Sequence, residues 1–256
     1  MTPIVGTALA IALAAAGLAL VRRFRSGEIL FTAASLLCAA VVGYEWIVTG
    51  QPPFANMFHV LVALGAAFAP VYWLVAVPGR LRGYQAGFSL GTAAALAAAL
   101  CMDREEIWRL PPALQSPWFV PHVATYMISY ALMGVGFLVL VAGGIQGRRS
   151  RKDAAAACDE ASCRFVLLAF PLMTFGLLSG ALWAEEAWGR YWSWDPKETW
   201  SLITWTLYLI YFHCRRSPGL RQWSPAAHVL AFLALLTTFF LVNLLPKMGS
   251  VLHSYV

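Results

Sequence analysis

Charged residues are scarce in this chain. Of its 256 residues, 12% are charged and 60% are hydrophobic, whereas a soluble domain carries roughly 25% charged and 45–50% apolar residues. This composition excludes a water-soluble enzyme, which needs more charge to cover its surface, and it excludes a disordered chain. At about 20 residues per span plus short loops, a chain of this length holds roughly seven to nine transmembrane helices. The composition therefore predicts an all-α, polytopic membrane protein.

Paired cysteines and long basic stretches are also missing. The five cysteines have no Cys-x-x-Cys and no Cys-x-x-Cys-His spacing: Cys38, Cys101, Cys158, Cys163 and Cys214. They are interpreted as small hydrophobic side chains, not as a disulfide framework or a zinc site, and the chain lacks the motif that attaches c-type haem. The net charge is +6, but the arginines form small clusters at the ends of apolar runs, as topological anchors do. No nucleic-acid partner is expected.

The apolar runs predict a transmembrane bundle of about eight spans. Each run is long enough, or nearly so, to cross roughly 30 Å of hydrocarbon. The expected spans are about 3–21, 29–49, 54–78, 84–102, 119–144, 165–184, 199–213 and 225–245. The first run is similar to a signal peptide, but the basic residues behind it favour a retained span.

The basic residues predict the orientation of these spans. With eight spans, one set of loops holds 13 of the 18 Lys and Arg residues and the other set holds five. The positive-inside rule places the richer set in the cytoplasm and both termini outside. Eight of the twelve acidic residues then fall on the outer side.

Three features meet on that outer side. His122 follows the loop of residues 103–118, Trp188–Trp200 connects the sixth and seventh spans, and His253 lies in the C-terminal tail. A planar macrocycle needs flat apolar faces, which Trp and Tyr supply, and its metal needs neutral imidazoles. Arg190 and Lys197 are candidate partners for its propionates. An ordinary aromatic belt at the membrane interface and a structural histidine remain the alternative.

The stretch Trp188-Gly189-Arg190-Tyr191-Trp192-Ser193-Trp194-Asp195-Pro196-Lys197-Glu198-Thr199-Trp200 resembles the tryptophan-rich "WWD" signature of the CcsA/ResC family of cytochrome c biogenesis proteins (system II). The resemblance extends over 176–187 and 201–213 on either side, and it includes 114–129 and 242–255. It is strong from about 114 to the C-terminus and weak before that. It implies a single integral membrane domain over 1–256, with a haem-handling core over 114–256.

The resemblance also implies roles for individual residues. His122 and His253 would be the two external axial ligands of the iron of a non-covalently bound haem b. His213 corresponds to the family's histidine within the membrane, although a side chain that merely reaches the interface is the alternative. The haem cradle would comprise Trp188, Gly189, Arg190, Tyr191, Trp192, Trp194, Asp195, Pro196, Lys197, Glu198 and Trp200. Asp195 and Glu198 are also expected to cap the start of the seventh span.

The chain departs from the family pattern in two places. Pro246-Lys247-Met248 lengthens the approach to His253, and Asn56-Met57-Phe58-His59 stands where relatives tend to have Asn-Leu-Tyr-Glu-Ser. We assign His59 to packing. His228 is expected to be structural, with a position facing His213 across the 214–227 loop as the alternative.

The function that the resemblance implies is that of the haem-handling subunit of a cytochrome c synthetase, a haem lyase. It would deliver haem to the outer face and present it to the CxxCH segment of apocytochrome c. The partner would be a ResB/CcsB-type membrane protein. The setting would be a bacterial plasma membrane or a thylakoid membrane. A haem exporter or chaperone without ligation activity is the alternative. A b-type electron-transfer subunit is disfavoured, because it would pair histidines within the bundle.

Overall fold

The computed structural model describes residues 1–54, 56–102 and 112–241, and these residues form helices and connecting turns without strands. The chain divides into two compact units, Met1–Pro111 and Pro112–Val256. The first unit contains α1 (Thr2–Leu20), α2 (Phe24–Thr49), α3 (Met57–Val71) and α4 (Gln85–Leu100). The second contains α5 (Phe119–Arg148), α6 (Lys152–Trp188), α7 (Pro196–Arg216) and α8 (Ser224–Leu236). The all-α prediction is confirmed, and the single-domain organisation stays a prediction.

Small side chains allow the helices of the first unit to pack closely. In α1, which lies against α2 and α4, Ala8, Ala12 and Ala15 are buried. Because lipid tails are as apolar as the helices, close backbone approach through small residues is the main source of such packing. A π-helical turn, η1 (Tyr72–Ala76), continues α3, and a 3₁₀ turn, η2 (Arg82–Tyr84), precedes α4.

A buried acid ties these helices together at one end of the first unit. Glu28 of α2 is 4% exposed, and its carboxylate accepts hydrogen bonds from the Tyr72 hydroxyl and from the Nε and Nη2 atoms of Arg82. A buried charge is tolerated when it is paired and hydrogen-bonded in this way. The contact fixes α2 against the turn between α3 and α4.

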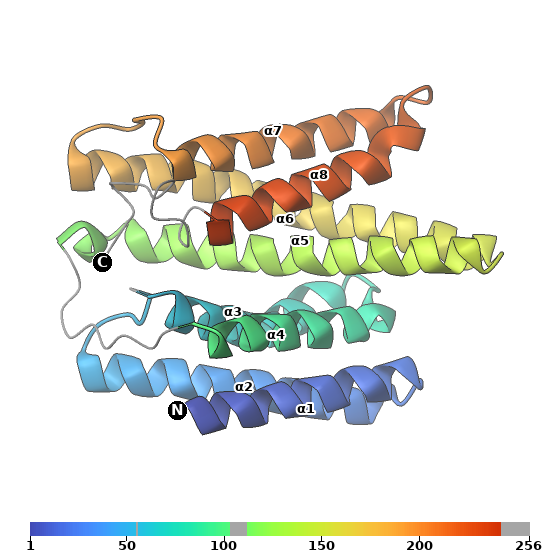
Figure 1. Cartoon of the computed structure of the whole chain (residues 1–256), viewed down its shortest axis with the longest axis horizontal. Coiled ribbons are helices and arrows are strands. Elements are labelled where there is room, and N and C mark those ends of the chain that lie inside the picture. Colours follow the sequence, from blue (N-terminus) through green and yellow to red (C-terminus); the bar gives the residue numbers. More distant parts are fainter. Residues whose placement is uncertain (55, 103–111, 242–256) are drawn as a thin grey trace. The chain divides into compact units, whose positions relative to one another are not determined.

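In the second unit, glycines bring α5 and α6 together as an antiparallel hairpin (Figure 1). A Cβ atom at Gly143 would lie 2.9 Å from Cβ of Cys158, and one at Gly136 would lie 3.4 Å from the carbonyl oxygen of Ser162. The two backbones are therefore as close as glycine allows. Helices α7 and α8 form a second antiparallel hairpin, joined through η4 (Arg221–Trp223), and a π-helical turn, η5 (Thr237–Leu241), continues α8.

The number of expected spans is close to the number of helices. Among the described residues, six helices are long and apolar enough to cross a membrane: α1, α2, α3 with η1, α5, α6, and α8 with its flanking turns. The fourth expected span is the 16-residue α4, and the seventh is α7, which carries charged residues at both ends. Each expected span therefore overlaps a helix in the described part of the chain, and six of these helices have the length and composition of spans.

One boundary differs clearly from the sequence-based expectation. The sixth span was expected to begin at about 165, yet α6 begins at Lys152 and runs 37 residues to Trp188. The run Ala154–Ala157 has high helix propensity, and the glycines of α5 pack against this part of α6. The basic connection between α5 and α6 is therefore only three residues long.

Candidate functional site

The imidazole of His122 is the best-defined functional group in the second unit. It lies in the first turns of α5, and its Nδ1 is 2.8 Å from the carbonyl oxygen of Gly176 on α6. A carbonyl oxygen only accepts hydrogen bonds, so Nδ1 carries the ring proton and Nε2 carries the lone pair. A histidine that binds a metal is commonly oriented in this way, by donating its other N–H to a carbonyl.

Aromatic rings surround this imidazole and connect it to the tryptophan-rich segment. The ring of His122 lies 5.5 Å from that of Trp183, with 31° between their planes, and 5.0 Å from that of Tyr126, with the edge of one ring toward the face of the other. The Trp183 ring lies 4.9 Å from the ring of Trp188. Trp183 itself is 3% exposed, and its indole N–H donates to the carbonyl of Ala113 at 2.6 Å. His122 and the start of the signature are thus two ring contacts apart.

The tryptophan-rich segment leaves α6 and enters α7 through two residues with left-handed backbone conformations. Gly189 ends α6 with φ +73°, and its N–H donates to the carbonyl of Glu185 at 2.8 Å. Trp194 has φ +60°, which is uncommon for a bulky residue. The side chains of Tyr191 and Trp194 are exposed, with 58% and 69% of their surface accessible, whereas that of Trp192 is half-buried. Trp192 meets Trp194 edge to face at 5.9 Å.

The indole N–H of Trp192 is buried and has no hydrogen-bond partner among the described residues. A buried donor without an acceptor costs about 1–3 kcal/mol. Trp192 therefore offers both a partly buried ring and an unused donor between α6 and α7.

Asp195 and Glu198 form a capping box at the start of α7, which confirms their expected capping role. The Asp195 carboxylate accepts from the backbone N–H of Lys197 at 3.1 Å, and Glu198 Oε2 accepts from the N–H groups of Ser193 and Asp195. Pro196 occupies the first helical turn, where its missing N–H costs nothing. This cap fixes where the tryptophan-rich segment ends.

Two basic residues flank the segment. The side chain of Arg190 is exposed and that of Lys197 is half-buried. Burial lowers the pKa of the Lys197 ammonium to about 8, and the carboxylate of Asp195 partly opposes this shift. Both are cations of the kind that pairs with carboxylates, and Lys197 loses its charge in a range close to physiological pH.

The histidines at the other end of the second unit lie in different surroundings. His213, in the last turn of α7, is exposed. His228 of α8 is completely buried, and its Nδ1 lies 3.3 Å from Oγ of Ser162, which donates to the carbonyl of Gly136 at 2.8 Å. The ring of His228 lies 5.8 Å from that of Tyr208 and 5.3 Å from that of Tyr211, both on α7, which suits the structural role expected for His228.

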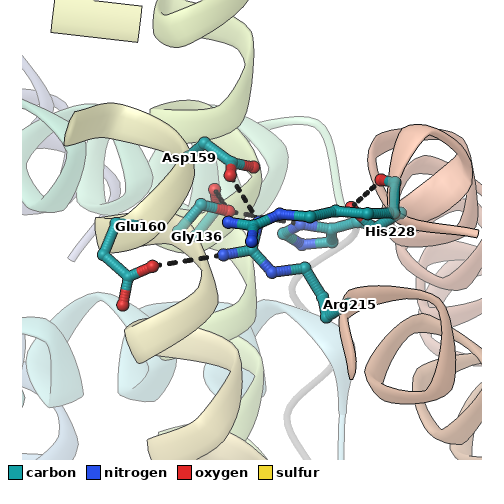
Figure 2. Close-up of polar contacts among 8 residues, drawn as sticks. Gly136, Asp159, Glu160, Arg215 and His228 are labelled. Carbon is teal, nitrogen blue, oxygen red and sulfur yellow. Dashed lines mark hydrogen bonds and ion pairs between the residues drawn. The ribbon is translucent and has the colours of Figure 1, made fainter. Parts of the chain in front are cut away.

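Close to His228, Arg215 joins α7 to α6. Figure 2 shows its guanidinium reaching the carboxylates of Asp159 and Glu160. Both acids belong to the part of α6 that was expected to be a loop. This end of the unit is thus held by charge, whereas the end that carries His122 is lined by aromatic rings.

The remaining histidines of the chain belong to the first unit or lie outside the described residues. His59 belongs to the first unit, where its Nε2 is 3.5 Å from Oε1 of Glu45 and its backbone N–H is capped by Asn56. His253 lies outside the described residues, as does the Pro246–Met248 insertion. Sequence reasoning missed Trp183 and the pair Gly176 and Gly180. The spacing of four between those glycines, directly before the signature, was an available signal for close packing at this place.

The fold and the site define a multi-pass helical membrane protein with a tryptophan-rich connection beside an oriented histidine. A sequence model of the family described as cytochrome C assembly protein matches residues 28–249, and the chain belongs to this family. It is similar to cytochrome c biogenesis protein CcsA of Chlamydomonas reinhardtii, with 34% identity over 89% of this chain and 67% of that protein. The CcsA proteins of Guillardia theta and Synechocystis are 33% and 30% identical, over 87% of this chain and 82% and 85% of theirs. The chain is therefore a CcsA-type cytochrome c biogenesis protein.

Proposed function

We propose that the outer end of the second unit holds haem and presents it to apocytochrome c for thioether formation. A role in cytochrome c assembly follows from the family. The finer assignment rests mainly on His122, whose Nδ1–H donates to the Gly176 carbonyl at 2.8 Å, which makes Nε2 the nitrogen that carries the lone pair in the neutral ring.

The residues beside His122 suit a porphyrin. Trp188 and Trp192 supply rigid apolar faces of the kind on which a flat macrocycle lies, and the buried ring of Trp183 packs between Trp188 and His122. Lys197 and Arg190 supply positive charge for propionates, and the unused N–H of Trp192 is a further donor. His253 is the second proposed ligand, on the sequence resemblance alone. Exposed His213 is proposed as the residue that meets haem within the membrane.

The reaction requires positioning more than acid–base chemistry. Each cysteine of the apocytochrome CxxCH segment adds its S–H across one vinyl group. A carbon–sulfur bond forms, the thiol hydrogen ends on the other vinyl carbon, and no net electrons are transferred. Fixing two reactants in one geometry can contribute as much as about 7–11 kcal/mol to lowering a barrier. His122 and His253 would hold the iron of the haem, and this ligation would favour the reduced form that the addition needs. Asp195 and Glu198 are already used in the helix cap.

A partner chain is part of this proposal. The outer connection between α6 and α7 runs only from Gly189 to Asp195, which is too short to grip an apocytochrome. A ResB/CcsB-type membrane protein with a large external domain would supply that grip. The site would face the extracytoplasmic side of a bacterial plasma membrane or the lumen of a thylakoid.

The test is to produce this chain together with such a partner and a reporter apocytochrome in cells that lack their own maturation system. We expect covalent haem on the reporter and non-covalent, low-spin haem on the purified complex. His122→Gly should lose haem or shift its spectrum, and added imidazole should restore it. His59→Gly is the matched control and should leave the spectrum unchanged. An unchanged spectrum in His122→Gly would exclude that residue as a ligand. Haem release without covalent haem on the reporter would favour the exporter alternative.

A further inference from the structure

The imidazole of His122 lies against a place on α6 where there is no side chain. A Cβ atom at Gly180 would be 2.6 Å from Cε1 of His122 and 2.7 Å from Nδ1, closer than real atoms approach, whereas Nε2 is 3.6 Å away. The edge of the ring that contains Nδ1 and Cε1 therefore faces the α6 backbone. The absence of a side chain at Gly180 is what allows this close approach.

The same edge of the ring makes the hydrogen bond. Nδ1 lies 2.8 Å from the carbonyl of Gly176, one helical turn before Gly180. A ring pushed away from Gly180 would move Nδ1 away from that carbonyl, and hydrogen bonds weaken steeply with poor geometry. The rings of Trp183 and Tyr126 also contact the imidazole. A methyl group at position 180 would therefore force the imidazole to rotate or to move against its neighbours.

We propose that Gly180 is a positioning residue for the haem ligand His122. By leaving the space beside the imidazole empty, it lets Nδ1 reach the Gly176 carbonyl and leaves Nε2 as the ring nitrogen that lies farther from Gly180. This inference rests on the proposed function, because it assumes that His122 binds iron. Gly180 touches neither haem nor iron and acts only through the histidine.

Gly176 contributes differently. A Cβ atom there would lie 2.9 Å from the ring of Tyr126, which packs edge-on against His122. A side chain at this position would thus disturb the neighbour of the ligand instead of the ligand. The two glycines lie on one face of α6 but make room for different rings. Gly180 makes room for the imidazole of His122, and Gly176 makes room for the ring of Tyr126, which packs against that imidazole.

The experiment compares three glycine-to-alanine variants in the complex with the partner chain. Gly180→Ala should lower haem affinity about tenfold, the lower end of the range for groups that orient metal ligands, and should shift the spectrum of the haem that remains. Gly143→Ala places a Cβ 2.9 Å from Cys158, so it disturbs the same pair of helices far along the chain from His122 and should leave that spectrum unchanged. Gly144→Ala meets nothing within 4 Å and controls for the substitution itself.

A second comparison works even where Gly180→Ala alone fails to fold, because removing the imidazole makes room for the methyl group. Without imidazole, His122→Gly with Gly180→Ala should hold the same amount of haem as His122→Gly alone, as residues that act through one another are not additive. The double variant should need a higher imidazole concentration for recovery, since the methyl group occupies the place of the ring.

Two results would overturn the role of Gly180 while leaving His122 as a ligand: a wild-type spectrum in Gly180→Ala, or a further loss of haem when Gly180→Ala is added to His122→Gly. A His122→Gly variant with an unchanged haem spectrum would instead contradict the proposed function itself. The two failures are therefore distinguishable.

Discussion

At the scale of single residues, the buried N–H of Trp192 can be tested apart from its ring. Trp192→Phe removes a donor that has no partner among the described residues, and removing such a group relieves a desolvation cost of about 1–3 kcal/mol. We expect the haem-free variant to unfold at the same or a higher temperature than wild type in detergent, and to retain less haem. Trp192→Ala should retain less still. Added imidazole should rescue neither variant, because no coordination position is vacated. A Phe variant that is less stable and binds haem normally would contradict the donor role.

Lys197 predicts a pH dependence. Its pKa is lowered to about 8 by burial, so the ammonium is charged below about pH 8 and neutral above it. If it pairs with a propionate, haem retention should fall as the pH rises through and beyond that value. Lys197→Arg stays charged and should flatten the fall, whereas Lys197→Met should show low retention at every pH. Titration of haem into the purified complex from pH 6.5 to about 9.5 measures this. A fall of equal size in the Lys and Arg proteins would assign it to another group.

One residue-level prediction was confirmed where residue type and spacing alone restrict the structure: Asp195-Pro196-Lys197-Glu198 carries the pattern of a helix cap, which the structure has. The roles of the histidines and the clustered tryptophans in holding haem stay predictions. Trp183 and Gly180 were missed because their importance depends on which neighbour they meet. The spacing of Gly176 and Gly180 indicates close packing, but it does not show that the neighbour is a histidine on another helix.

At the scale of elements, the start of α7 should be sensitive to the loss of its cap. Asp195→Ala removes the acceptor of the Lys197 N–H, and loss of an N-cap costs typically about 1 kcal/mol. We expect a lower unfolding temperature and partial loss of haem, without rescue by imidazole. Asp195→Asn keeps an acceptor and should restore most of both properties. Failure of Asn to restore haem binding in a stable protein would show that the charge of Asp195 matters beyond the cap.

Helix lengths were predicted less well than helix positions. Apolar runs indicate which residues suit a membrane, but they do not show where a helix continues into water. The first 13 residues of α6, which include Asp159 and Glu160, are helical because they pack against the glycine-lined face of α5 and pair with Arg215. The start of α6 is therefore determined by residues of α5 and α7, which the apolar run of α6 does not reveal.

For the whole molecule, the partition of basic residues predicts sidedness. Within the second unit, the α5–α6 and α7–α8 connections lie at the end opposite to the tryptophan-rich segment (Figure 1), and most of the basic residues of the unit gather there. Reporter fusions after Arg151 and after Val256 should therefore report opposite sides, with Arg151 in the cytoplasm. If both report the cytoplasm, the placement of His122 and His253 on one outer face is wrong.

At this scale the fold class, the approximate number of spans and the family followed from composition and one motif. The division into two compact units did not, because both units are built from the same kinds of apolar run. The two units differ only in which helices pack against each other. That packing depends on a few small residues in each apolar run.

The nature of the acceptor of the His122 Nδ1–H determines which mutations can remove this hydrogen bond. It is a main-chain carbonyl, that of Gly176, and every amino acid has one. No codon change at position 176 can delete it, so the tautomer of the proposed ligand is insulated from direct mutation in a way that a carboxylate or hydroxyl partner would not be. The position that is sensitive to mutation is instead Gly180, because the methyl group of an alanine there would collide with the imidazole. Natural variation should therefore be restricted at Gly180, although this position contributes no chemical group.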